Sequence, residues 1–137
     1  MLDLSKERHA RADARLRSDI MIWLGTVKPD NTPHIVPVWF LWDGDSFYIY
    51  SKPDQKIRNL KQNPAVMLAL DDTKGGDDPI MVAGEATLLP REEALSTKAA
   101  YVAKYQALLD RYGWTGESMA QEYSEPIKIK PTRFFAP

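Results

Sequence analysis

The alternating stretch from His34 to Trp42 limits the folds open to this chain more than any other part of the sequence. Successive side chains of an extended strand point to opposite faces, and here both faces are apolar. A strand of this kind is buried on both sides. We therefore expect one side to face the interior of a small barrel, and the other to meet a helix, a ligand or a second subunit. Pro37 cannot donate a ladder hydrogen bond, so it marks a sheet edge or a bulge.

Further short strands and peripheral helices are predicted around this stretch. Turn residues at Lys28–Pro33 and Asp43–Asp45 join strands into hairpins. Asp54 is the expected N-cap of a short helix, and Gly84 marks a bulge. Such short connections favour antiparallel neighbours, so we expect a mainly β barrel with helical decoration. The expected strands are residues 19–27, 34–42, 46–51, 65–70, 79–89 and 127–135, and the expected helices are residues 3–18, 55–62, 91–112 and 116–123.

The composition is that of a globular protein with one domain spanning residues 1–137. A chain of 137 residues with 44% hydrophobic and 27% charged residues can hold a core without covalent staples. It has no cysteine, which excludes disulfides, a thiol nucleophile and a thiolate metal site. Its net charge of −1 leaves no broad basic field, so we expect no nucleic-acid partner.

No membrane or metal partner is expected either. The N-terminal residues contain no apolar signal-peptide core, and the apolar run 35–42 is too short to span a bilayer. We therefore expect a soluble, cytoplasmic protein. The two histidines, His9 and His34, lie in unrelated contexts, and the acidic residues 71–78 are expected to form a solvated loop. These patterns favour neither a metal site nor a histidine-based triad.

The segment from Tyr50 to Asn59 carries the clearest chemistry. It combines a strand end, a break and a helix start with hydroxyl groups and the cations Lys52, Lys56 and Arg58. Free backbone N–H groups at a helix start and nearby cations form a common phosphate site. From composition alone, solvated surface cations are an equally good interpretation.

Short motifs in a fixed order decide between these interpretations. They are His-Ile-Val-Pro-Val-Trp-Phe at 34–40, Tyr-Ser at 50–51, Lys-Ile-Arg-Asn-Leu at 56–60 and Asn-Pro at 63–64. Their order and spacing resemble the pyridoxamine 5′-phosphate oxidase-like split-barrel family, most closely the branch that uses the deazaflavin coenzyme F-420. The resemblance covers roughly residues 18–89, with a weaker echo at 131–133.

The resemblance implies an antiparallel, Greek-key split β-barrel that forms a homodimer with cofactor sites at the subunit interface. Residues Lys56, Arg58 and Asn59 would hold the phosphate, with Lys52 as a weaker member. The strand 36–39 would line the flavin-like ring, and Tyr50 and Ser51 would close the tail pocket. The predicted cofactor-binding residues are Val36, Pro37, Val38, Trp39, Tyr50, Ser51, Lys52, Lys56, Ile57, Arg58 and Asn59.

The chain also departs from the classical oxidase of that family. It has Asp54-Gln55-Lys56 where that enzyme has a Ser-Arg-Lys triplet, and it lacks the C-terminal extension that reads pyridoxal phosphate. Oxidation of pyridoxamine phosphate is therefore not expected.

The expected function is an oxidoreductase in which coenzyme F-420 passes a hydride to a small electron-poor organic substrate. Two alternatives stay open: an FMN-dependent oxidase or reductase of the same fold, and a non-catalytic carrier of the cofactor or of another ligand. No side chain stands out as a general acid or base, which suits chemistry that the cofactor supplies. No catalytic residue is predicted.

Overall fold

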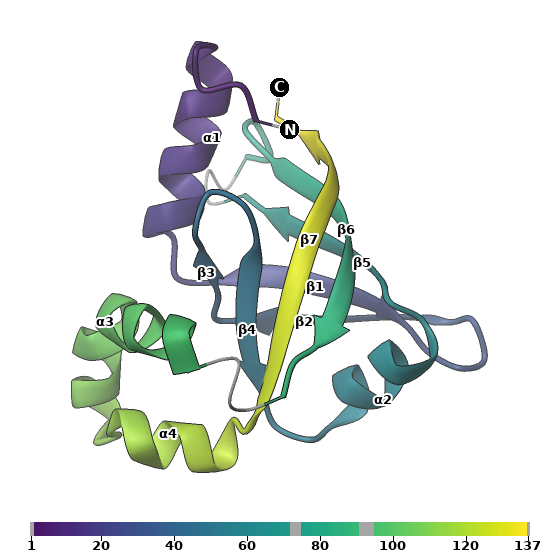
Figure 1. Ribbon diagram of the computed structural model, residues 1–137. Coiled ribbons are helices and arrows are strands. Elements are labelled where there is room, and N and C mark those ends of the chain that lie inside the picture. The colour runs from purple at the N-terminus through teal and green to yellow at the C-terminus, as the bar shows by residue number, and fades with distance from the viewer. Residues whose placement is uncertain (1, 72–74, 91–94, 137) are drawn as a thin grey trace.

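The fold is one curled antiparallel sheet decorated by helices (Figure 1). The computed structural model describes residues 2–71, 75–90 and 95–136. Within these residues, seven strands follow the order β2-β1-β5-β6-β7-β4-β3. The strands are β1 Ile22–Val27, β2 Pro33–Val38, β3 Leu41–Trp42, β4 Phe47–Ser51, β5 Ala65–Leu70, β6 Ile80–Leu88 and β7 Glu125–Phe135. The helices are α1 Glu7–Ser18, α2 Gln55–Gln62, α3 Leu95–Tyr112 and α4 Gly116–Glu122.

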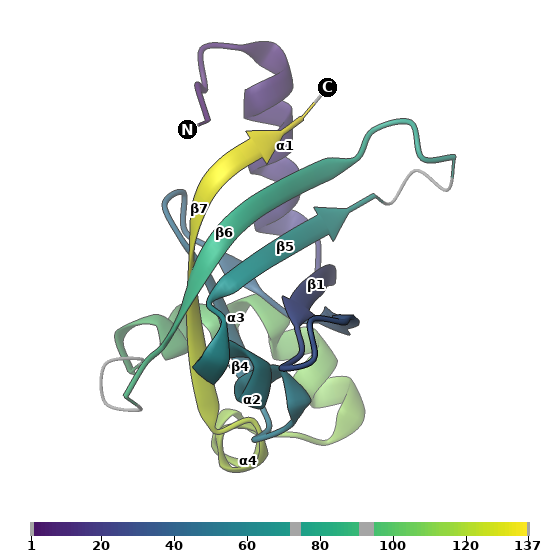
Figure 2. The same cartoon turned by 90° about the vertical axis from the view of Figure 1, so that its right-hand side faces the viewer.

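The expected mainly β architecture with peripheral helices is confirmed, and so is the hairpin formed by β1 and β2. Buried side chains from β1, from β3 to β7 and from α1 and α2 form the main core. Helices α1 and α2 lie at opposite ends of the molecule (Figures 1 and 2). Helix α1 contributes Ala12 and Leu16 to this core. Ala10 and Ala14 on the same helix are exposed. No described helix combines the length and the apolar composition that a membrane-crossing helix requires.

The predicted long strand His34–Trp42 is in fact two strands at opposite ends of the sheet order. Strand β2 ends at Val38, and the short β3 pairs with β4 instead. Within this chain β2 is not buried on both sides, because Ile35 is 63% exposed. The predicted cover of that side by a ligand or a second subunit stays a prediction. The placement of Pro37 at a sheet edge is confirmed, since β2 is the first strand of the sheet.

The predicted bulge at Gly84 is confirmed as well. The register between β6 and β7 shifts between Ala83 and Gly84. A Cβ atom at position 84 would lie 2.8 Å from the carbonyl oxygen of Lys130, closer than a side chain tolerates. Glycine is therefore required there by the close approach of the two strands.

Helices α3 and α4 form a cap over β4, β3 and the connection between β2 and β3, with a hydrophobic cluster of its own. Tyr101, Tyr105 and Leu109 are the buried face of α3, whereas Ala99 is exposed. The start of the predicted helix, residues 91–94, lies outside the described residues, as do residues 72–74 of the predicted acidic loop. The cap joins the sheet through Tyr50, Trp39 and Leu41.

Candidate functional site

A cavity of about 460 Å³ lies between the strand ends and the cap. This volume lies within the range of small-molecule sites. Several of the predicted cofactor-binding residues line it, namely Pro37, Val38, Trp39, Tyr50, Ser51 and Lys56. The structure therefore brings together the predicted ring strand, the end of β4 and the first turn of α2.

The rest of the lining is not among the predicted cofactor-binding residues. It comes from the cap and from the residue before β1, and consists of Met21, Tyr101, Leu109, Tyr112, Trp114, Met119 and Tyr123. The helical spacing of Tyr101, Tyr105 and Leu109 was a signal for a buried helix face. Nothing local in the sequence says which part of the sheet that face covers.

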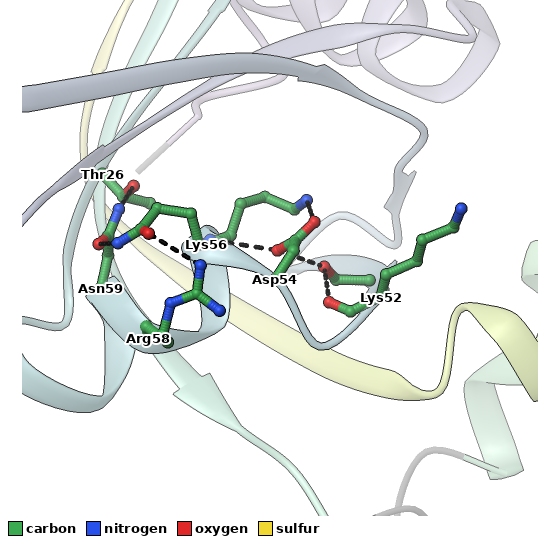
Figure 3. A network of polar contacts seen from close by, with 8 residues as sticks. Thr26, Lys52, Asp54, Lys56, Arg58 and Asn59 are labelled. Carbon is green, nitrogen blue, oxygen red and sulfur yellow. Dashed lines mark hydrogen bonds and ion pairs between the residues drawn. The ribbon is translucent and has the colours of Figure 1, made fainter.

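One side of the cavity carries a polar cluster of Ser51, Asp54 and Lys56 (Figure 3). Asp54 caps α2 as expected, because its Oδ1 accepts the backbone N–H of Lys56 at 3.1 Å. The Lys56 ammonium donates to Asp54 Oδ2 at 2.6 Å, and the Lys56 side chain is only 12% exposed. Ser51 Oγ lies 2.7 Å from the Lys52 carbonyl oxygen and 3.4 Å from Asp54 Oδ1. Lys56 is therefore a largely buried cation at the cavity wall.

The other predicted tail residues do not line the cavity. Arg58 is exposed, leaves α2 in a different direction from Lys56 (Figure 3), and donates to Gln55 Oε1 at 2.9 Å. Asn59 is fully buried, and its Nδ2 donates to Thr26 Oγ1 at 2.9 Å while its Oδ1 accepts from Gln55 at 2.7 Å. Its amide therefore joins α2 to β1, and its side chain does not line the cavity.

Three further predicted residues lie near the cavity without lining it. Ile57 is part of the main core, and Val36 pairs with Leu24 on the inner face of the sheet. Lys52 is exposed, with its Nζ 3.6 Å from Glu122 Oε2 and 5.3 Å from the ring centre of Tyr123. Lys52 therefore contacts the cap instead of the polar cluster.

The aromatic walls of the cavity are packed in fixed orientations. The rings of Trp39 and Tyr105 stack with their centroids 4.3 Å apart and their planes 2° apart. Tyr50 and Tyr101 meet edge to face at 4.7 Å. Burial raises the pKa of the Tyr101 phenol well above its usual value, so it stays neutral at physiological pH. These walls offer flat, uncharged surfaces on which a ring system can stack.

The break between β2 and β3 is held by the cap. Tyr105 Oη accepts the backbone N–H of Phe40 at 2.8 Å, and it lies 2.7 Å from the carbonyl oxygen of Ile20. The Lys104 ammonium donates to the Phe40 carbonyl oxygen at 2.7 Å and lies 3.9 Å from the centre of the Phe40 ring. Helix α3 thus supplies hydrogen-bond partners that the sheet does not supply at this point.

Lys104 should leave a signature in the pH dependence of stability. Burial lowers its pKa to about 8, while the Asp19 carboxylate acts in the opposite direction. An unfolded lysine titrates near 10.5, so between these two values the unfolded chain binds the proton that the folded chain has lost. The free energy of unfolding therefore rises with pH in this window.

We expect this rise to amount to about 1 kcal/mol between pH 7.5 and 9.5, after allowing for solvent screening at a partly exposed site. Urea unfolding of the wild type and of Lys104→Met at several pH values measures it. The stability of the wild type should increase relative to that of the variant as pH rises. Parallel pH profiles of the two proteins would contradict the assignment.

The described residues contain no group of three histidine, cysteine, aspartate or glutamate side chains arranged to hold a metal ion. The two histidines have different surroundings. His9 Nδ1 accepts the backbone N–H of Asp3 at 2.9 Å, whereas His34 sits on β2 opposite Thr26. Neither side chain lines the cavity.

The fold agrees with what the comparison with known families finds. The model of the family described as pyridoxamine 5′-phosphate oxidase matches residues 9–136, almost the whole chain. The chain belongs to this family. The curled antiparallel sheet with its helices is accordingly a pyridoxamine 5′-phosphate oxidase-like split barrel, as the resemblance implied.

The proteins whose solved structures share this split barrel are described with different functions. An F-420 reductase is 28% identical, with a TM-score of 0.68 over 90% of this chain and 94% of that chain. The heme storage protein HutZ of Vibrio cholerae is 18% identical, with a TM-score of 0.71 over 95% and 93% of the two chains. An FAD-binding protein of Mesorhizobium loti is 18% identical, with a TM-score of 0.71 over 91% and 88%. No curated protein matches this sequence. At 18% identity the last two structures show the fold alone.

The chemistry of the cavity fits a flavin-type cofactor. Its aromatic and aliphatic lining suits a planar ring, and the nearly buried Lys56 suits an anionic group at the end of a tail. Pro37 to Trp39, at the end of the edge strand β2, line the cavity together with Tyr50 and Ser51 at the end of β4 and with Lys56. The residues that line the cavity are therefore compatible with the ring-plus-tail shape that the family implies.

Proposed function

We propose that this split-barrel protein is an oxidoreductase that binds the deazaflavin coenzyme F-420 and transfers a hydride to a small electron-poor organic molecule. The observation that carries the proposal is the cavity, in which aromatic walls and a single nearly buried cation, Lys56, face the same space. The 28% identity to an F-420 reductase supports the choice of cofactor.

In this proposal each part of the site has a distinct task. The bound cofactor supplies the hydride chemistry. Lys56 anchors the anionic tail, and Trp39, held by Tyr105, sets the position of the ring. The cap residues Trp114 and Tyr123 exclude water from the ring and leave room for the acceptor beside it.

The most direct test is to identify the small molecule that the protein retains. Mass spectrometry after denaturation of the purified protein, together with its visible spectrum, distinguishes F-420 from FMN. Fluorescence titration with each cofactor then gives the affinities. We expect F-420 to bind, and its reduced form to be oxidised by at least one acceptor in a panel of quinones and enones. Absence of F-420 binding refutes the cofactor assignment, and binding without turnover favours a carrier.

We further propose that the protein acts as a homodimer that pairs through the outer face of β1, β2 and β5. On this face the register places Ile35 and Met67 on either side of Gly25, with Trp23 beside them. Trp23, Ile35 and Met67 are 42%, 63% and 49% exposed, an unusual row of large apolar side chains for a free surface. The face reaches Pro37, which also lines the cavity, so a second copy of the chain would border the site.

The double variant Ile35→Glu/Met67→Glu is therefore expected to be a monomer, because it buries two charges in the proposed interface. Sedimentation velocity of the wild type and the variant at the same concentration measures this. Leu4→Glu, which adds one charge at an exposed leucine outside this face, is the control and should stay dimeric. A monomeric wild type at micromolar concentration rules the interface out.

A further inference from the structure

The polar cluster beside the cavity contains a carboxylate where an anion-binding site normally offers only donors. We propose that Asp54 determines phosphate specificity, favouring a ligand phosphate with one negative charge, a diester, over a dianionic monoester. This inference rests on the proposed function, because it concerns the group that binds next to Lys56.

The contacts of Asp54 show why its charge matters. Its two oxygens already accept from the Lys56 backbone N–H at 3.1 Å and from the Lys56 ammonium at 2.6 Å (Figure 3). Ser51 Oγ lies 3.4 Å away on the same side. These are the donors that a phosphate at the cavity wall would use, since Ser51 and Lys56 both line the cavity. The Asp54 carboxylate therefore already uses donors that a bound phosphate would need.

The charge balance of the cluster follows from the same contacts. Lys56 and Asp54 together carry no net charge, so an incoming anion must share Lys56 with a carboxylate. The two other cations of the segment from Tyr50 to Asn59 are directed elsewhere, Arg58 towards Gln55 and Lys52 towards Glu122. The repulsion between Asp54 and a ligand grows in proportion to the charge of that ligand.

Phosphate esters differ in this property. A monoester has a second pKa near 6 and is mostly dianionic at pH 7.5. A diester has no second proton to lose and stays monoanionic. A cofactor whose tail continues beyond its phosphate carries a diester there, whereas FMN ends in a monoester. Asp54 consequently favours a continuing tail over a terminal phosphate.

Three flavins with the same ring system test this charge rule at pH 7.5. They are riboflavin, which has no phosphate, riboflavin 4′,5′-cyclic phosphate, which is a monoanionic diester, and FMN. The variant Asp54→Asn removes the charge and retains a residue that caps helices well. Glu7→Gln is the matched control, since it removes one carboxylate from α1, at the opposite end of the molecule from α2 (Figure 1).

We expect Asp54→Asn to tighten binding by about 3-fold for each unit of ligand charge, that is about 3-fold for the cyclic diester and about 10-fold for FMN. Riboflavin affinity should not change, and Glu7→Gln should bind all three flavins as the wild type does. The gain for FMN should shrink as the salt concentration rises. Thermal unfolding of each variant verifies that it folds, and Asp54→Ser, another neutral capping residue, replaces Asn if it does not.

The outcomes separate this inference from the proposed function. Suppose that riboflavin binds, but that Asp54→Asn raises the affinities for FMN and for the cyclic diester equally or not at all. The role of Asp54 is then refuted, and the cavity remains a flavin site. If none of the three flavins and no F-420 binds to the wild type or to Asp54→Asn, both proposals are refuted.

Discussion

Replacing Lys56 by alanine is expected to weaken binding of the phosphate-bearing cofactor by about 10- to 100-fold, whereas replacing Arg58 by alanine should change it by less than about 3-fold. A hydrogen bond to a charged group contributes about 1.5 to 3 kcal/mol, which corresponds to this loss. Lys56 lines the cavity and is largely buried, so its charge is weakly screened. Arg58 is exposed and already bound to Gln55.

The Lys56 variant has a second effect in the same direction. Without its ammonium group, the Asp54 carboxylate loses its 2.6 Å partner and repels an incoming phosphate more strongly. The affinity for riboflavin, which carries no phosphate, should remain close to that of the wild type. A loss confined to charged ligands therefore identifies the cation as the cause, and a loss for all ligands indicates damage to the cavity.

Fluorescence titration with FMN and with F-420 measures these changes. Lys61→Ala is the control, because Lys61 is an exposed cation in the last turn of the same helix. Equal losses for Lys56→Ala and Arg58→Ala contradict the cavity geometry. They would restore the prediction from the family resemblance, in which both cations hold the tail.

Local chemistry in the sequence predicted the start of α2 well. Asp54 was expected to cap the helix, and it does so by accepting the backbone N–H of Lys56. The turn at Asp43–Asp45 and the bulge at Gly84 were also predicted, because each depends on residues near it in the chain or on glycine itself. Contacts between residues a few positions apart depend on the local sequence, so they can be predicted from it.

The break after Val38 could not be predicted in the same way. Alternating apolar residues have the same pattern in one long strand as in two short ones, and neither Trp39 nor Phe40 is a strand breaker. The backbone groups at the break are satisfied by Lys104 and Tyr105, more than sixty residues later in the chain. The pattern of apolar residues along the chain carries no information about contacts between such distant residues.

The candidate site was predicted in part for the same reason. Ser51 and Lys56 are close in sequence to a strand end and a helix start, and they line the cavity. Asn59 belongs to the same motif, but the side chain of Thr26 from β1 binds its amide. The opposite wall comes from α3 and α4, whose packing on β4 and on the connection between β2 and β3 is a tertiary contact.

Removing the Tyr105 hydroxyl is expected to have a large effect on stability. Tyr105→Phe should lower the free energy of unfolding by about 1 to 3 kcal/mol, because the N–H of the fully buried Phe40 loses its acceptor. Tyr105→Ala should lower it by about 3 to 5 kcal/mol, since it also leaves a cavity where a fully buried ring packed. Urea unfolding at pH 7.5 measures both values.

Two observations serve as controls for this prediction. Tyr112→Phe removes a hydroxyl from the same helix at a residue that is 59% exposed, and it should change stability by less than about 0.5 kcal/mol. Hydrogen exchange of the Phe40 amide should accelerate in Tyr105→Phe. Unchanged stability together with a protected Phe40 amide would mean that another group accepts this bond.

The two Tyr105 variants also separate the stability of the fold from the shape of the site. In Tyr105→Phe the ring that stacks on Trp39 remains, so riboflavin affinity should change by less than about 3-fold in the folded variant. In Tyr105→Ala the Trp39 ring loses the surface 4.3 Å from it and can leave its place in the cavity wall. Riboflavin affinity should then fall by about 10-fold, the equivalent of one aromatic stacking contact. Equal affinities in these two variants would show that Trp39 keeps its position without Tyr105, and that α3 supports the sheet but not the ring site.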